Sequence, residues 1–261
     1  MSKFLSKVND KKGFNNVELH PDYKYITTFG ILNLEPNIAY KKDTQGSEFS
    51  FLVLDGSCTI NVNGKHYGQI VSRDSVFSGL PYAFYAPINS MISLVGAAKI
   101  AVFGGRCEED SEPTVIGPQD IKVMDVGKDN WQREVRLIIG PEGPSVNTIL
   151  GETLNPPGNW SGIPPHKHEV DDLPEQSKHE EIYYFKTDKP QGWGIERIYS
   201  QERKINEILF IEDNSVTFMP WGYHQVASAP GYTLYYSFFL AGVGKKLAGY
   251  EDQDHCWIKT A

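Results

Sequence analysis

The chain has 261 residues, of which 40% are apolar and 22% are charged. This composition is ordinary for a globular protein, and the length leaves room for one large domain or two smaller ones. The net charge of −8 argues against proteins that bind nucleic-acid phosphates or anionic lipid surfaces through general positive charge. The net charge does not exclude a small anionic substrate, because only the charges near the binding site act on such a molecule.

The N-terminal segment, residues 1–16, is polar and lacks the apolar core of a signal peptide. Three widely spaced cysteines, Cys58, Cys107 and Cys256, form no CxxC pair and favour a reducing compartment. The longest uncharged apolar run, residues 232–244, is too short to cross a bilayer as a helix. We therefore expect a cytoplasmic protein with no membrane or nucleic-acid partner.

Strand signals dominate the first half of the chain. Apolar runs bounded by Gly, Asn or Asp turns predict strands at residues 49–56, 57–68, 90–96 and 99–105. The segment that follows, residues 108–120, is acidic and contains two prolines. We interpret it as a linker between an N-terminal half, residues 1–117, and a C-terminal half, residues 118–261.

The second half repeats this pattern of short apolar runs between turn residues, and neither half shows clear helical periodicity. Its expected strands lie within residues 134–140, 181–188, 192–200, 207–214, 215–222 and 232–242. Short strands at regular spacing with turn signals predict an all-β fold of barrels or sandwiches. Two similar β halves in one chain also indicate an internal duplication.

Histidines and carboxylates concentrate in residues 164–185. His166 and His168 are two residues apart, so on an extended backbone their side chains point to the same face. Glu181 begins the strand EIYYF, and His224 follows a Pro-x-Gly turn that begins a later strand. These four side chains can converge inside a barrel and hold one divalent transition metal. Imidazoles with one carboxylate suit Mn, Fe, Ni, Co or Zn rather than Ca or Mg.

Longer strings of the sequence narrow the interpretation to a family. The HxH pair, the glutamate at the start of a strand and the later PxGxH resemble the cupin motifs. The strings PPGNWSGIPPHKH, DDLPEQ, EEIYYF, PQGWGIERIYS, PWGYHQV, PGYTLYY and DQDHCWI together resemble the 5-deoxy-glucuronate isomerase family of inositol catabolism. The resemblance extends weakly over the first half, through FLVLDGSCTINVNG and SVFSGLPYAFYAP. It implies a bicupin, with two cupin barrels in one chain, that converts 5-deoxy-glucuronate to 5-dehydro-2-deoxygluconate.

A metal, a base and a cation would suit this aldose–ketose isomerisation. A divalent metal can bind the carbonyl and hydroxyl oxygens of the sugar while a base moves a proton between adjacent carbons. The candidates for that base, among which the sequence does not choose, are Tyr183, Asp171 and Asp172. The candidates for binding the sugar acid are Arg197, Lys167 and Tyr223. Of these, the arginine offers a planar two-pronged donor for the carboxylate.

The first half contains only His20 and His66 and no HxH pair, and Phe49 stands where a cupin would have its ligand glutamate. We therefore expect one metal per chain, and we expect the first barrel to serve packing or assembly. A homo-oligomer is possible. Residues 171–175 can equally be a polar surface loop. A cupin dioxygenase and a non-enzymatic sugar-binding cupin are the alternative functions, because a fold alone decides none of these.

Overall fold

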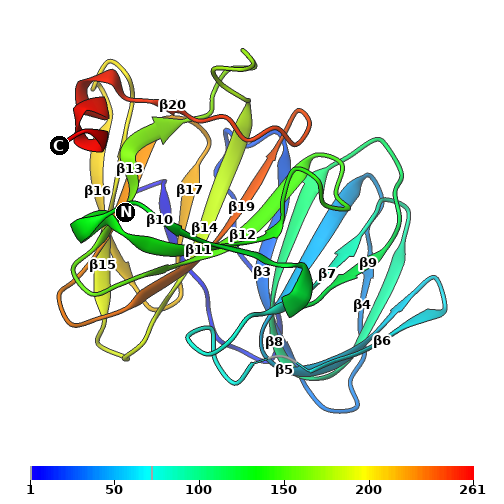
Figure 1. Cartoon of the computed structure of the whole chain (residues 1–261). Helices are drawn as coiled ribbons and strands as arrows, with labels where there is room; N and C mark the ends of the chain where they lie inside the picture. The colour runs from blue at the N-terminus through cyan, green and yellow to red at the C-terminus, as the bar shows by residue number, and fades with distance from the viewer. Residues whose placement is uncertain (1, 72) are drawn as a thin grey trace.

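The chain is built almost wholly of antiparallel strands, which form two lobes side by side (Figure 1). The computed structural model describes residues 2–71 and 73–261. Within these residues the helices are short 3-10 turns: η1 (Pro118–Asp120), η2 (Asp129–Trp131) and η3 (Gln253–Lys259). The predicted all-β fold class is therefore confirmed.

The N-terminal lobe contains one eight-stranded sheet with the order β2-β3-β8-β5-β7-β9, in which β4 also pairs with β8 and β6 with β5. Its two long strands, β5 and β8, pair along almost their whole length. They come very close at Gly56, where φ is +82° and an added Cβ would lie 2.2 Å from the Ala97 carbonyl oxygen. The strands are β2 (Gly13–Asn16), β3 (Ile26–Leu34), β4 (Tyr40–Asp43), β5 (Ser47–Val62), β6 (Lys65–Val71), β7 (Tyr82–Ala86), β8 (Met91–Arg106) and β9 (Thr114–Ile116).

The C-terminal lobe has two sheets that face each other across a core. The seven-stranded sheet has the order β1-β17-β14-β19-β12-β11-β10, and the five-stranded sheet has the order β16-β15-β18-β13-β20. The first comprises β1 (Leu5–Lys7), β10 (Lys122–Val126), β11 (Arg133–Ile139), β12 (Thr148–Asn155), β14 (His179–Thr187), β17 (Ser215–Met219) and β19 (Leu234–Gly242). The second comprises β13 (Trp160–Lys167), β15 (Trp193–Tyr199), β16 (Asn206–Glu212), β18 (Tyr223–Ser228) and β20 (Tyr250–Glu251).

The start of the chain lies in the C-terminal lobe, because β1 pairs with β17 (Figure 1). All other strands before the expected linker belong to the N-terminal sheet, and all strands after it belong to the two C-terminal sheets. The division into residues 1–117 and 118–261 stays a prediction, and β1 shows that the first few residues pack with the other half.

The two lobes share a buried interface that uses the outer face of the seven-stranded sheet. Phe103 of the N-terminal lobe stacks on Phe239, with ring centroids 5.0 Å apart. On β14, therefore, both faces are buried: Ile182 and Tyr184 belong to the core shared with the N-terminal lobe, and Tyr183 belongs to the core between the two C-terminal sheets. This explains why the strand EIYYF has no polar face.

Two buried carboxylates join the lobes reciprocally. Glu180, on β14, accepts hydrogen bonds from the backbone N–H groups of residues 24–26, at 2.6, 2.8 and 2.9 Å, just before and at the start of β3. Glu48, on β5, accepts from the backbone N–H groups of Val146 and Asn147, both at 2.8 Å, just before β12. Each lobe therefore satisfies backbone donors of the other.

Candidate metal centre

The three histidines come from neighbouring strands of the five-stranded sheet. His166 lies near the end of β13, and His168 directly follows that strand. His166 is paired with His224 of β18, so the two imidazoles stand beside each other with ring centroids 4.8 Å apart. One ring nitrogen from each of the three histidines lies within 4.8 Å of those of the other two. The two-residue period of the strand therefore brings these side chains together as expected.

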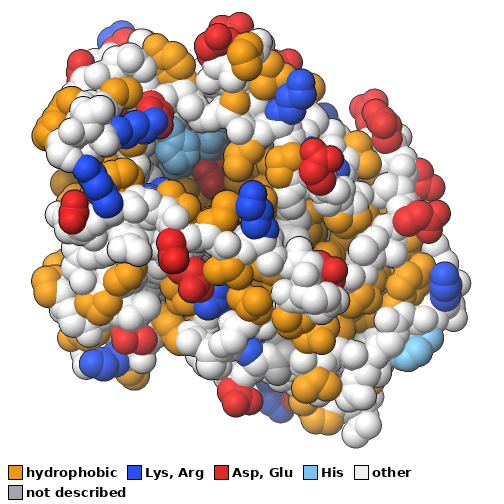
Figure 2. All heavy atoms as spheres, viewed as in Figure 1, with side chains coloured by type: hydrophobic (Ala, Val, Ile, Leu, Met, Phe, Trp, Pro, Cys, Tyr) orange, Lys and Arg blue, Asp and Glu red, His pale blue; other side chains and the backbone are white. Residues whose placement is uncertain are grey.

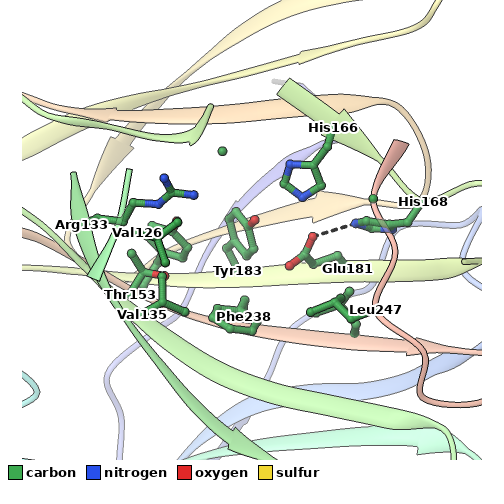
Figure 3. Close-up of a pocket in the computed structure, with 14 residues that line it drawn as sticks. Val126, Arg133, Val135, Thr153, His166, His168, Glu181, Tyr183, Phe238 and Leu247 are labelled. Carbon is green, nitrogen blue, oxygen red and sulfur yellow. Dashed lines mark hydrogen bonds and ion pairs between the residues drawn. The ribbon is translucent and has the colours of Figure 1, made fainter. Parts of the chain in front are cut away.

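Glu181 reaches the same point from β14 in the opposite sheet. Its Oε2 atom lies 2.9 Å from His168 Nε2 (Figure 3). The same atom lies 3.1 Å from His224 Nε2. The side chains of Glu181 and His224 are 5% and 1% exposed, so water does not satisfy them. The four predicted ligand residues thus converge between the two sheets.

Backbone carbonyl groups fix which nitrogen each imidazole presents. His168 Nδ1 lies 2.7 Å from the His179 carbonyl oxygen, and His224 Nδ1 lies 3.3 Å from the Gly222 carbonyl oxygen. A carbonyl oxygen only accepts, so Nδ1–H donates in both cases, and in its neutral form each ring directs the lone pair of Nε2 at Glu181. His224 Nε2 is buried and has no hydrogen bond of its own. Lone pairs facing a carboxylate suit a bound metal ion.

Burial and mutual contacts set the charges of this cluster. Burial, followed by the proximity of His224 and His168, lowers the pKa of His166 to about 3, so its ring is neutral. Burial alone would raise the pKa of Glu181, but the adjacent His168 and His224 side chains hold it well below its usual value. The cluster therefore offers an ionised carboxylate and at least one neutral imidazole, both of which are metal-binding forms.

A cavity of about 250 Å³ adjoins the cluster. Figure 2 shows histidine side chains and an acidic side chain at the bottom of a hollow in the C-terminal lobe. His166, His168 and Glu181 line one end of the cavity, and Arg133 lies at the other end with Tyr183 between them (Figure 3). The size suits a small molecule rather than a polymer.

The segment that leads into β20 closes one side of this cavity. Leu247 and Gly249 line it, and a Cβ added at Gly249 would lie 2.8 Å from a carbon of the His166 ring. The end of the chain is held by Asp252, which accepts hydrogen bonds from the Tyr199 hydroxyl and from Arg203, both at 2.7 Å. The string DQDHCWI thus anchors the segment that lies against His166.

Arg133 was not among the residues predicted from the sequence. It begins β11, and its cross-strand neighbour is Val126 of β10. Burial lowers the pKa of its guanidinium, and the nearby Tyr236 and Tyr183 counteract this effect. The only local signal was a cation at the start of a strand. That Arg133 and His166 line the same cavity depends on how β11 packs in the barrel.

The three predicted substrate-binding residues lie outside the cavity. Lys167 lies between His166 and His168 on an extended backbone, so it points to the opposite side and contacts Glu169 and Gln201 at 3.1 and 2.7 Å. Tyr223 precedes His224 and stacks on Tyr199.

Arg197 follows the inward-facing Glu196, stands over the Tyr199 ring and donates to Asn206 at 2.9 Å. None of the three residues therefore lines the cavity, as a substrate-binding residue was expected to. Each is next in sequence to a residue whose side chain points into the barrel, so its own side chain points outward.

The three candidates for the base also separate. Tyr183 lines the cavity, two residues beyond Glu181 on the same face of β14. Asp171 and Asp172 are exposed on the loop after β13 and do not line the cavity. Burial raises the pKa of Tyr183 well above its usual value, and the Glu181 carboxylate adds to this. Tyr183 is therefore a neutral phenol that can donate a hydrogen bond.

The histidines of the N-terminal half lie apart. His20 is buried, with its ring stacked on Phe4 at 5.2 Å, and His66 is exposed on β6. Phe49 is buried inside the N-terminal lobe. Within residues 2–71 and 73–261, the cluster of metal-binding side chains that stands out is the one in the C-terminal lobe. The prediction of one metal per chain remains to be tested.

A family model described as the KduI/IolB family matches residues 4–258. A relative from Bacillus velezensis named 5-deoxy-glucuronate isomerase is 34% identical over 91% of this chain and 89% of its own length. One of the same name from Bacillus licheniformis is 34% identical over 99% of this chain and 94% of its own.

The chain also resembles solved structures. An IolB-like protein from Salmonella typhimurium has a TM-score of 0.93 and 24% identity, covering 99% of this chain and 100% of that one. An oxalate decarboxylase from Lactobacillus farciminis has a TM-score of 0.71 and 9% identity, covering 100% and 91%. At these identities the likeness concerns the fold alone, and together with the two β lobes it confirms the predicted bicupin. Among the described residues, no helix has the length and apolar character needed to cross a membrane.

Proposed function

The chain belongs to the KduI/IolB family, and we propose that it is the metal-dependent aldose–ketose isomerase that converts 5-deoxy-glucuronate to 5-dehydro-2-deoxygluconate in myo-inositol catabolism. The relatives named 5-deoxy-glucuronate isomerase align over almost the whole chain. The observation that carries the proposal is that His166, His168, His224 and Glu181 meet at one end of a cavity that has Arg133 at the other.

The four side chains at the inner end would hold one divalent transition metal, and Zn, Mn, Fe, Ni and Co all suit this donor set. Such an ion supplies Lewis-acid polarisation of a carbonyl and its neighbouring hydroxyl. The carbonyl groups of His179 and Gly222 keep the imidazoles of His168 and His224 oriented, so the ligand atoms need little rearrangement.

Arg133 would bind the carboxylate of the sugar acid. A guanidinium offers two parallel N–H donors that match the two carboxylate oxygens, and in a largely apolar cavity this pair is stronger than in bulk water. Holding the carboxylate at Arg133 directs the aldehyde end of the chain toward His166 and Glu181, at the other end of the cavity (Figure 3).

Tyr183 would act on the proton transfer. Its phenol stays protonated at neutral pH, because burial raises its pKa, so it can donate to a sugar oxygen that gains negative charge. A neutral phenol is a poor base, so we assign Tyr183 the donor role. Asp171 and Asp172 are exposed on a loop and are weaker candidates for the base.

The proposal is tested with protein purified without added metal. Elemental analysis should find about one equivalent of a divalent transition metal per chain, and NMR should follow loss of the aldehyde signal and gain of the ketone signal without O₂ or nicotinamide. A strict requirement for O₂ would instead establish the dioxygenase, and saturable binding of the sugar acid without turnover would establish the non-enzymatic cupin. Two tightly bound equivalents would show that the N-terminal lobe also binds metal.

A further inference from the structure

The end of the cavity around Arg133 bears on how the protein recognises a deoxy sugar, and this inference rests on the proposed function. In 5-deoxy-glucuronate the carbon next to the carboxylate is a methylene, whereas glucuronate has a hydroxyl there. With the carboxylate at Arg133 and the aldehyde at the histidine cluster, that carbon lies beside Arg133. The groups around Arg133 therefore decide whether a hydroxyl at this position finds a partner.

Apolar side chains surround Arg133. Val126 is its cross-strand neighbour on β10, and Val135 is two residues along β11, on the same face. Phe238, on β19, lines the same cavity; the close-up shows Val126 and Val135 beside Arg133, and Phe238 below Tyr183 (Figure 3). Val126 and Val135 are both partly exposed, as side chains that line an accessible cavity are.

The hydroxyl groups at this end are already engaged. The Tyr236 hydroxyl donates to Ser161 Oγ at 2.9 Å, and Thr153, the cross-strand partner of Tyr236, interacts with it as well. The guanidinium of Arg133 donates to the Trp131 carbonyl oxygen at 3.3 Å, and its other N–H groups would be taken up by the carboxylate. A hydroxyl on the neighbouring carbon would thus face valine and phenylalanine side chains.

We propose that Val126, Val135 and Phe238 form an apolar wall that selects a methylene beside the substrate carboxylate and rejects a hydroxyl there. The physical basis is that a buried hydroxyl loses its hydrogen bonds to water and gains none from this wall. An apolar pocket typically rejects an added hydroxyl by about 100-fold in kcat/KM. The wall would therefore act as a specificity determinant and leave the proton transfer itself unchanged.

Val126→Thr and Val135→Thr test the wall, because threonine keeps the shape of valine and adds a hydroxyl. Val123→Thr is the matched control, since Val123 lies on the same strand as Val126 but is 46% exposed and absent from the cavity lining. The measured quantity is the ratio of kcat/KM for 5-deoxy-glucuronate to that for glucuronate, with glucuronate scored as a competitive inhibitor where its turnover is too slow.

The comparison must be made between variants, because the 5-hydroxyl of glucuronate also closes a ring and lowers the concentration of free aldehyde. That equilibrium is a property of the sugar and is the same for every variant. Either cavity variant should lower the ratio about tenfold, with metal content unchanged. The control should leave it unchanged.

An unchanged ratio in both cavity variants, with 5-deoxy-glucuronate still converted by the wild type, would overturn the wall and leave the proposed function standing. Failure of the wild type to convert 5-deoxy-glucuronate would overturn both. If one cavity variant does not fold, the other still decides the outcome, because each adds a hydroxyl beside Arg133 independently.

Discussion

Replacing Glu180 or its neighbour Glu181 by glutamine should have opposite consequences, and the comparison tests the register of β14. Glu181 points between the two C-terminal sheets, with its carboxylate 2.9 Å from His168 Nε2. Glu180 points the other way and accepts three backbone N–H groups of residues 24–26. The first carboxylate therefore belongs to the histidine cluster, and the second joins the lobes.

The expected loss of stability in Glu180→Gln follows from counting donors. A glutamine has one acceptor oxygen with two lone pairs, so at least one of the three N–H groups would face an NH₂ group, at a cost of about 1–3 kcal/mol. The two remaining bonds lose their charge assistance, at a further cost of about 1 kcal/mol each. Burial raises the pKa of Glu180 despite these bonds, so desolvation offsets part of their benefit. We therefore expect the free energy of unfolding to fall by about 2–3 kcal/mol, with the metal retained.

Glu181→Gln should instead weaken metal binding. Changing a partner that merely orients a ligand typically costs 10–100-fold in metal affinity, so removing an anionic ligand should cost about 100-fold or more. Urea unfolding with a chelator present measures stability, and elemental analysis after dialysis measures metal. If the Glu180 variant lost its metal while the Glu181 variant kept it, the assignment of the two faces of β14 would be refuted.

Three further exchanges test other parts of the structure. Arg133→Lys should raise KM for the sugar acid about tenfold or more with little change in metal content, because lysine loses the paired donors. Arg197→Lys should leave KM unchanged. The reverse result in steady-state kinetics would assign the substrate carboxylate to Arg197. Burial raises the pKa of Glu196 to about 8, so the folded chain keeps a proton that the unfolded chain releases near the ordinary glutamate pKa of 4.5. The free energy of unfolding of the metal-free protein should therefore fall by about 3–5 kcal/mol as the pH rises from 4.5 to 8, and Glu196→Gln should abolish that fall. If the free energies of unfolding of the wild type and the variant changed in parallel with pH, this expectation would be contradicted. Glu48→Gln should destabilise the fold by about 2–3 kcal/mol without affecting metal content, because Glu48 accepts hydrogen bonds from the Tyr85 hydroxyl and two backbone N–H groups. An unchanged unfolding midpoint would count against that role.

The grouping of the proposed metal ligands could be predicted from the sequence because their geometry is largely local. The two-residue period places His166 and His168 on one face, and the strand after Glu181 fixes its face as well. The same period, applied one residue further, excludes Lys167 as a partner of the histidines that flank it. It also turns Tyr223 away from His224. The expectation that these two residues bind the substrate came from their proximity in sequence to the histidines, and the alternation of a strand turns both away from this cavity.

Arg133 illustrates what the sequence could not supply. It lies 33 residues before His166, on a strand of the other sheet, and it reaches the cavity only because β11 pairs with β12 and β12 with β19 in that sheet. No pattern in the sequence gives the order of strands in a sheet, and Arg133 and Arg197 are both arginines within strands. Choosing between them required knowing which face of each strand is turned inward.

The sheet orders give the strongest argument that the two lobes arose from one unit. In the N-terminal sheet the order is β2-β3-β8-β5-β7, and the seven-stranded sheet contains the matching run β11-β12-β19-β14-β17. In this correspondence β5 matches β14, and the second residue of each is the glutamate that joins the lobes, Glu48 and Glu180. The third residue of each then faces the inside of its own lobe: Phe49 lies in the N-terminal core, and Glu181 lies at the histidine cluster. The position that carries the lobe contact is therefore the same in both halves, whereas the adjacent inward position is an apolar core residue in one and a carboxylate in the other. This is the physical basis for assigning packing to the first lobe and metal chemistry to the second.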